Sequence, residues 1–198
     1  MRSYCGRFAT FLPLLLLLLI EAAHAHPHMW VTLKSDMIFA ADGALIAVRY
    51  AWSFDEMTSA FATLSVKTQQ KGVFTREDLE PLVQPTLLSI KESDYFTSVK
   101  TNGTKQHFAS PVDCWLDFEE GILTLHFTIP FTSPVRAQSF ELDLYDPSYF
   151  VDISFAEKAP VTLLNAPSGC ELLIARQSWA QAVNKVTLTC RSAPADEN

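Results

Sequence analysis

The sequence lacks the short motifs that carry hydrolytic, phosphate-binding or redox chemistry. It contains no G-x-S-x-G, no H-E-x-x-H, no glycine-rich phosphate loop and no C-x-x-C. Nothing in the chain therefore supports hydrolase chemistry, and we predict a protein that is not an enzyme.

Basic residues and glycines are also scarce. The chain has 15 Lys and Arg against 22 Asp and Glu, a net charge of -7, and only 6 glycines beside 14 phenylalanines and 11 prolines. An acidic chain is poorly suited to nucleic acid and mildly favourable to cations. The composition predicts a globular, β-leaning protein without a nucleic-acid partner.

Long hydrophobic runs are absent after the N-terminus, and the one apolar run there is too short to span a membrane. Arg2 and Arg7 precede the leucine-rich run 11–20, and Ala23 and Ala25 have the small-x-small spacing of a cleavage site. A spanning helix needs roughly 20 apolar residues. We therefore predict a signal peptide over 1–25 and one domain over 26–198, with no membrane insertion after cleavage.

Three cysteines follow the predicted cleavage site. Export to an oxidising compartment makes a disulfide plausible, and Cys170 and Cys190 flank a short segment near the C-terminus, so we pair them. Cys114 is then left over. Its alternation with apolar residues favours a buried, inert thiol over metal ligation or intermolecular pairing.

Hydrophobic periodicity indicates the secondary structure. Apolar residues alternate over 29–39 and again over 44–52, where Ile46, Val48, Tyr50 and Trp52 share one side, and alternation resumes from Tyr95 onwards. Asn102-Gly103 and Glu120-Gly121 mark two hairpins. Between these stretches the period becomes helical.

The helical stretch has its own signals. A capping box over 53–56, with Ser53 at the cap, begins one helix with Met57, Phe61 and Leu64 at helical spacing. A second helix starts near Thr75, and Pro85 is expected to kink or stop it. We predict an α+β, mostly β fold: an antiparallel sheet or sandwich with a two-helix insertion, 53–92, between early strands.

The predicted mature N-terminus is the densest group of metal-ligand atoms in the sequence. Cleavage after Ala25 frees the amine of His26, whose reference pKa is about 7.7–8.0, two residues before His28. The amine and Nδ1 of an N-terminal histidine close a six-membered chelate on one metal ion. Pro27 has no N–H to deprotonate, so a square-planar chelate through backbone amides is blocked. Imidazole and amine ligands suit Zn, Cu, Ni or Co better than Ca or Mg.

Other readings of the polar residues remain open. Two histidines beside a cleavage site are also compatible with a frayed terminus. His107 and His126 are isolated on predicted strands and are poor ligand candidates. Asp55 and Glu56 are favoured as helix-cap residues, and Asp146 as the first residue of a turn.

Several segments together resemble a known family. His26-Pro27-His28-Met29-Trp30-Val31, Trp52-Ser53-Phe54-Asp55-Glu56, Tyr145-Asp146-Pro147-Ser148-Tyr149-Phe150 and the late Cys170 follow the signal peptide in this order. The chain resembles the bacterial periplasmic family called domain of unknown function 1007. The resemblance implies an accessory protein of a Gram-negative periplasm, working with an inner-membrane metal permease of the NicO nickel/cobalt type or with a Zev-type zinc system. Many members carry an acidic residue where this chain has Thr32.

Three hypotheses follow. The first is a periplasmic metal-binding protein that captures Zn, Ni or Co, rather than Cu, through His26 and His28, with Asp146 or Asp55 completing the ligand shell, and passes the metal to the permease. The second is a copper enzyme with a histidine brace, for which only His107 and His126 could supply the distant ring. The third is a structural permease partner that docks through an exposed aromatic such as Trp30, Trp52 or Trp115.

Overall fold

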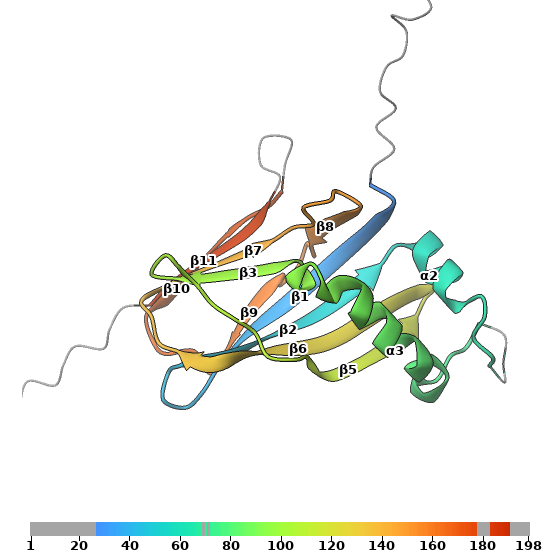
Figure 1. The fold of residues 1–198 in the computed structure, drawn as a ribbon, viewed down its shortest axis with the longest axis horizontal. Helices are drawn as coiled ribbons and strands as arrows, with labels where there is room; N and C mark the ends of the chain where they lie inside the picture. Colours follow the sequence, from blue (N-terminus) through green and yellow to red (C-terminus); the bar gives the residue numbers. More distant parts are fainter. Residues whose placement is uncertain (1–26, 69, 71, 178–182, 191–198) are drawn as a thin grey trace, which may run out of the picture.

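The computed structural model describes residues 27–68, 70, 72–177 and 183–190. These residues form two facing β-sheets with two helices at one end (Figure 1). The helices α2 (Glu56–Thr63) and α3 (Arg76–Lys91) and the short η1 (Asp94–Phe96) lie between the second and third strands. The strands are β1 (Met29–Phe39), β2 (Leu45–Phe54), β3 (Thr97–Thr101), β4 (Thr104–Lys105), β5 (Val112–Glu119), β6 (Ile122–Val135), β7 (Ser139–Leu144), β8 (Val151–Phe155), β9 (Val161–Leu164), β10 (Cys170–Ala175) and β11 (Asn184–Cys190). The mostly β class and the position of the two helices are confirmed.

The larger sheet has the order β5-β6-β2-β1-β8, and β9 also pairs with β1. β1 is antiparallel to β2 but parallel to both β8 and β9, which follow one another along the same edge of β1. This sheet is therefore mixed. The smaller sheet, β10-β11-β7-β3-β4, is antiparallel.

The core lies between the sheets and follows the predicted alternation. In β1, Val31, Leu33, Met37 and Phe39 are buried, while Trp30, Thr32 and Lys34 are exposed. Facing them in the second sheet are buried residues such as Phe140 and Leu142. α3 covers the part of the larger sheet nearest β5 and contributes Leu79, Val83, Leu87 and Ile90 to the same core.

Three local expectations are wrong. Ser53 lies inside β2, and α2 is capped by Asp55, which accepts a hydrogen bond from the Thr58 N–H. A register shift between Leu45 and Ala47 puts Leu45 in the core in place of Ile46. Trp52 is only 1% exposed, packed against Phe96 and Phe127, so it offers no docking surface.

α3 also passes Pro85 without ending. It runs as one helix through both Pro81 and Pro85. The two prolines lie one turn apart on the exposed side of the helix. The carbonyls that lose their helical partners there face water, which reduces the cost of each proline.

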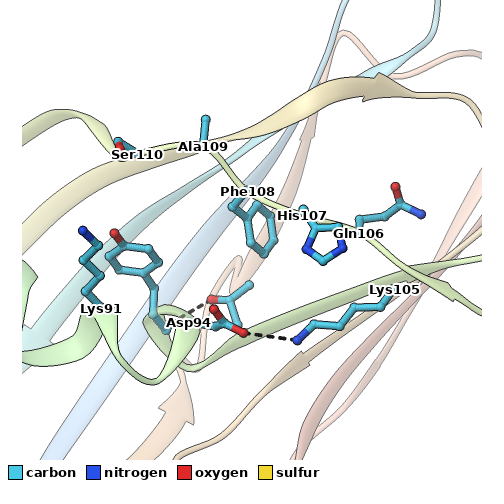
Figure 2. Close-up of a pocket in the computed structure, with 10 residues that line it drawn as sticks. Lys91, Asp94, Lys105, Gln106, His107, Phe108, Ala109 and Ser110 are labelled. Carbon is cyan, nitrogen blue, oxygen red and sulfur yellow. Dashed lines mark hydrogen bonds and ion pairs between the residues drawn. The ribbon is translucent and has the colours of Figure 1, made fainter.

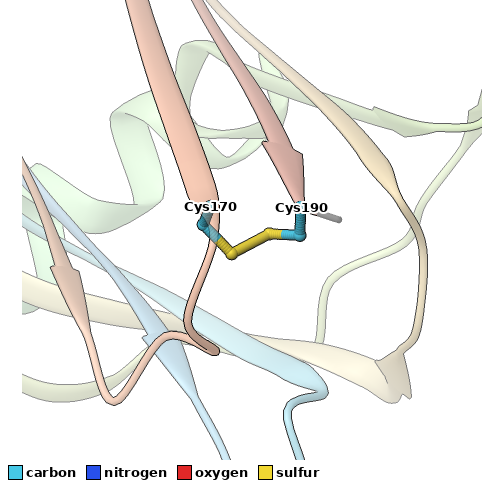
Figure 3. Close-up of a disulfide and its surroundings, with 2 residues drawn as sticks. All are labelled: Cys170 and Cys190. Atoms are coloured by element: carbon cyan, nitrogen blue, oxygen red, sulfur yellow. A yellow bond between two sulfur atoms is a disulfide. The ribbon is translucent and has the colours of Figure 1, made fainter. Parts of the chain in front are cut away.

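The predicted disulfide is confirmed. Cys170 and Cys190 are directly opposite one another in the β10–β11 pair, and their sulfurs are bonded (Figure 3). Cys114 is the free cysteine of the described residues and is half-buried. Burial, with a smaller contribution from Asp113, raises the pKa of its thiol, as expected of an unreactive cysteine.

Candidate functional site

His28 lies just before β1, on the outer side of the larger sheet. Its backbone N–H donates to the Phe150 carbonyl at 2.9 Å, and its ring centroid is 5.1 Å from that of Phe150. The His28 side chain is exposed. His26, the other histidine of the predicted centre, lies outside the described residues. The loop before β8 therefore fixes where His28 sits.

Asp55 joins the start of α2 to the start of β1. Its carboxylate accepts hydrogen bonds from the Trp30 N–H at 3.1 Å, the Thr58 N–H at 2.9 Å and the Thr58 hydroxyl at 2.6 Å. Its own N–H donates to the Trp30 carbonyl at 3.0 Å. Burial by itself raises the pKa of the Asp55 carboxyl, but these hydrogen bonds outweigh it, and the net pKa lies below the ordinary value. Asp55 is thus a cap residue tied to the backbone two residues after His28.

Asp146 organises the loop that carries Phe150. It is only 6% exposed. Its carboxylate accepts from the Ser148 N–H at 2.8 Å, from the Ser148 hydroxyl at 2.7 and 2.8 Å on its two oxygens, and from the Val151 N–H at 2.8 Å. A carboxylate has about four acceptor positions, and two N–H groups and one shared hydroxyl proton occupy most of them. The geometry favours a role in shaping the turn that presents Phe150 to His28.

Three of the residues singled out from the sequence therefore meet at one end of the molecule. Asp55 reaches the Trp30 backbone, Asp146 reaches the Val151 backbone, and β1 and β8 pair in parallel there, with Met29 opposite Val151. Within the described ranges, no three His, Cys, Asp or Glu side chains are grouped so as to hold a metal ion. A centre at this place would need His26, and metal binding by His26, His28, Asp55 or Asp146 stays a prediction.

Asp152 is a nearby carboxylate that sequence reasoning missed. It lies opposite Trp30 in the parallel β1–β8 register, and both residues alternate with core residues of their strands, so the two share the outer face with His28. Its Oδ1 accepts a hydrogen bond from the Gln177 side-chain amide at 2.8 Å. The alternation of β8 is visible in the sequence, but the pairing of β8 with β1 is not.

His126 is already engaged by neighbouring side chains. Its ring stacks on Trp115 at 3.8 Å between centroids, and its Nε2 is 2.9 Å from an Asp117 carboxylate oxygen. The Arg76 guanidinium lies 4.1 Å from the centre of the Trp115 ring. Trp115 is only partly exposed because its ring contacts both the His126 ring and the Arg76 guanidinium.

His107 lies in a separate pocket of about 220 Å³ beside η1. Figure 2 shows His107 together with Lys91 and Lys105, which also line this pocket. The Lys105 ammonium group pairs with the Asp94 carboxylate at 3.1 Å. With two ammonium groups against the one carboxylate of Asp94, the charged side chains in the wall leave a net positive charge, which is unfavourable for a metal cation.

Two features bear on location. No helix among the described residues is long and apolar enough to cross a membrane. The Cys170–Cys190 disulfide is typical of proteins outside the cytosol.

Comparison with known proteins places the chain in a family. The sequence profile described as "Protein of unknown function (DUF1007)" matches residues 11–197. An "Uncharacterized protein" of Haemophilus influenzae (strain ATCC 51907 / DSM 11121 / KW20 / Rd) is 22% identical over 151 residues, which cover 74% of this chain and 71% of the relative. The match over nearly the whole sequence shows that this chain belongs to the DUF1007 family.

Proposed function

We propose that the exported chain is a periplasmic, non-enzymatic metal-binding protein of a divalent transition-metal transport system. His26 and His28 bind Zn, Ni or Co, and the protein passes the ion to an inner-membrane permease. The observation that carries the proposal is the placement of His28: its side chain is exposed while its backbone and ring are held by Phe150.

The chemistry follows from the ligand types. The His26 amine and ring supply two nitrogens and the His28 ring supplies a third. Because Pro27 prevents a closed amide chelate, the ion stays exchangeable, as delivery to a permease requires. An oxygen ligand would come from a carboxylate on the same outer face. Asp152, with one hydrogen-bond donor in Gln177, is less committed than Asp146.

Metal titration tests the proposal. Zn, Ni, Co and Cu(II) are titrated by calorimetry into the mature protein beginning at His26 and into the His26→Ala/His28→Ala variant. We expect at least a tenfold loss of affinity in the variant, because two of the three donor nitrogens, the two imidazole rings, are removed.

Two controls make the result specific. His107→Ala/His126→Ala removes the same number of imidazoles elsewhere and should leave the affinity unchanged. One extra residue before His26 should weaken binding, because the chelating amine is lost. Equal affinities in the mature protein and the His26→Ala/His28→Ala variant would refute the proposal.

A further inference from the structure

Helix α2 and its C-cap Leu64 carry their large apolar side chains on the solvent side, while the small Ala62 packs against the core. Met57, Phe61 and Leu64 are 72%, 77% and 77% exposed. Their spacing of i, i+4 and i+7 puts them on one face of the helix. We call these three side chains the apolar face of α2.

The orientation of α2 is fixed by polar contacts on its inner side. Ser59 is fully buried, and its hydroxyl oxygen accepts a hydrogen bond from the Leu123 N–H at 2.9 Å. The Ser59 hydroxyl in turn donates to the Phe54 carbonyl at the end of β2, at 3.4 Å. Turning the apolar face inward would break these contacts and leave the Leu123 N–H unpaired. The exposure of the apolar face is therefore built into the packing.

A lipid surface is a poor occupant for this face. Helices that lie on membranes combine an apolar face with Lys and Arg. α2 has the apolar face but no Lys or Arg, and it begins with acidic Asp55 and Glu56 in a chain of net charge -7. Anionic lipids would repel it.

A second copy of the chain is also a poor occupant. A stable interface buries about 800 Å² on each partner, from about 20–30 residues. The three side chains of this short helix and its C-cap supply only a fraction of that area when two convex helices meet. A concave partner surrounds the same side chains and buries more of each.

We propose that α2 is a docking helix whose apolar face inserts into an apolar groove on a partner protein, with basic groups where the groove meets Asp55 and Glu56. Three anchors at i, i+4 and i+7 are the pattern by which helices occupy such grooves. Asp55 caps this helix and also binds the Trp30 N–H, two residues after His28. A protein that holds α2 therefore lies beside His28, and, resting on the proposed function, we identify it as the membrane permease that receives the metal.

Site-specific photo-crosslinking in the source bacterium tests the proposal. A photoreactive amino acid replaces Phe61 in the full-length exported protein, and a matched control carries it at Leu173, which is 69% exposed on β10 of the other sheet. We expect light to give an adduct from position 61, with peptides of an integral-membrane metal permease identified by mass spectrometry. The adduct should fall at least fivefold with Met57→Ser/Leu64→Ser and be absent from position 173.

Each other outcome overturns the inference. These are no adduct, an adduct with lipid, an adduct of two copies of this chain, an adduct with another class of protein, or equal yields from positions 61 and 173. Metal affinity of the Met57→Ser/Phe61→Ser/Leu64→Ser variant is measured in parallel and should match that of the unmodified protein. A chain that binds metal but gives no permease adduct refutes only the docking surface, whereas a permease adduct from a chain that binds no metal refutes only the metal role.

Discussion

Asp146 illustrates how one buried carboxylate holds a loop in place. Its hydrogen bonds from Ser148 and Val151 fix the turn before β8, and Phe150 of that turn contacts His28. The sequence already predicted an Asp-initiated turn here. It did not show that the turn lies against the start of β1, because that contact joins residues more than a hundred positions apart.

The Asp146→Ala variant should be clearly destabilised. We expect a loss of about 2–4 kcal/mol in the free energy of unfolding, because the part-buried N–H groups of Ser148 and Val151 and the Ser148 hydroxyl lose a charged acceptor. Urea denaturation measures it. Asp152→Ala, which removes a carboxylate of the same region that accepts a hydrogen bond from the Gln177 side chain, should cost less than about 1 kcal/mol. Equal losses in the two variants would contradict this account of Asp146.

Asp55 makes a prediction about pH. Because its folded-state pKa lies below the ordinary value of 3.8, its ionised form stabilises the fold. That contribution is fully present above the ordinary pKa and is lost as the pH falls through the lowered one.

The Asp55→Asn variant removes this titration while keeping a residue favourable at a helix N-cap. Urea midpoints are compared at about pH 6, above the ordinary pKa of Asp55, and at about pH 2.5, below that ordinary pKa. The unmodified protein should lose more stability between the two pH values than the variant does. The same loss in both would show that Asp55 does not contribute in its ionised form.

At the scale of elements, α2 and α3 use their helical patterns in opposite ways. α3 buries its apolar residues Leu79, Val83 and Leu87, whereas α2 buries Ser59 and Thr63 and exposes its apolar face. Periodicity identifies a helix and the residues that share a face. Which face turns inward is decided by the contact between Ser59 and the Leu123 N–H, a tertiary hydrogen bond.

This inverted packing can be tested on single residues. Ser59→Ala should lower the free energy of unfolding by about 1–3 kcal/mol, because the buried Leu123 N–H loses its acceptor. Phe61→Ser, a much larger change, should cost less than about 0.5 kcal/mol, because the ring is exposed. Thermal or urea denaturation gives both values. A costly Phe61→Ser with a neutral Ser59→Ala would mean that α2 packs the other way round.

For the whole molecule, the disulfide links β10, an edge strand of the smaller sheet, to its neighbour β11. Cys170 and Cys190 are 20 positions apart in sequence and join β10 to β11. Cys170→Ser/Cys190→Ser should lower the free energy of unfolding by about 3 kcal/mol, since the unfolded chain regains the entropy of an open loop. Guanidinium denaturation measures the change.

Cys114→Ser is the matched control for the disulfide variant. It leaves the bond intact and alters a half-buried thiol, so we expect less than about 1 kcal/mol. A disulfide variant as stable as the Cys114→Ser chain would show that the two strands hold together without the bond.

The sequence alone determined what depends on neighbours along the chain. Strand alternation gave the core face of β1, turn residues gave the hairpins at Asn102-Gly103 and Glu120-Gly121, and cysteine spacing gave the disulfide. Only the tertiary structure decided the rest. The parallel pairing of β1 with β8, the position of Asp152 opposite Trp30 and the outward apolar face of α2 all arise between segments far apart in sequence, where backbone hydrogen bonding and packing, rather than local periodicity, select the arrangement.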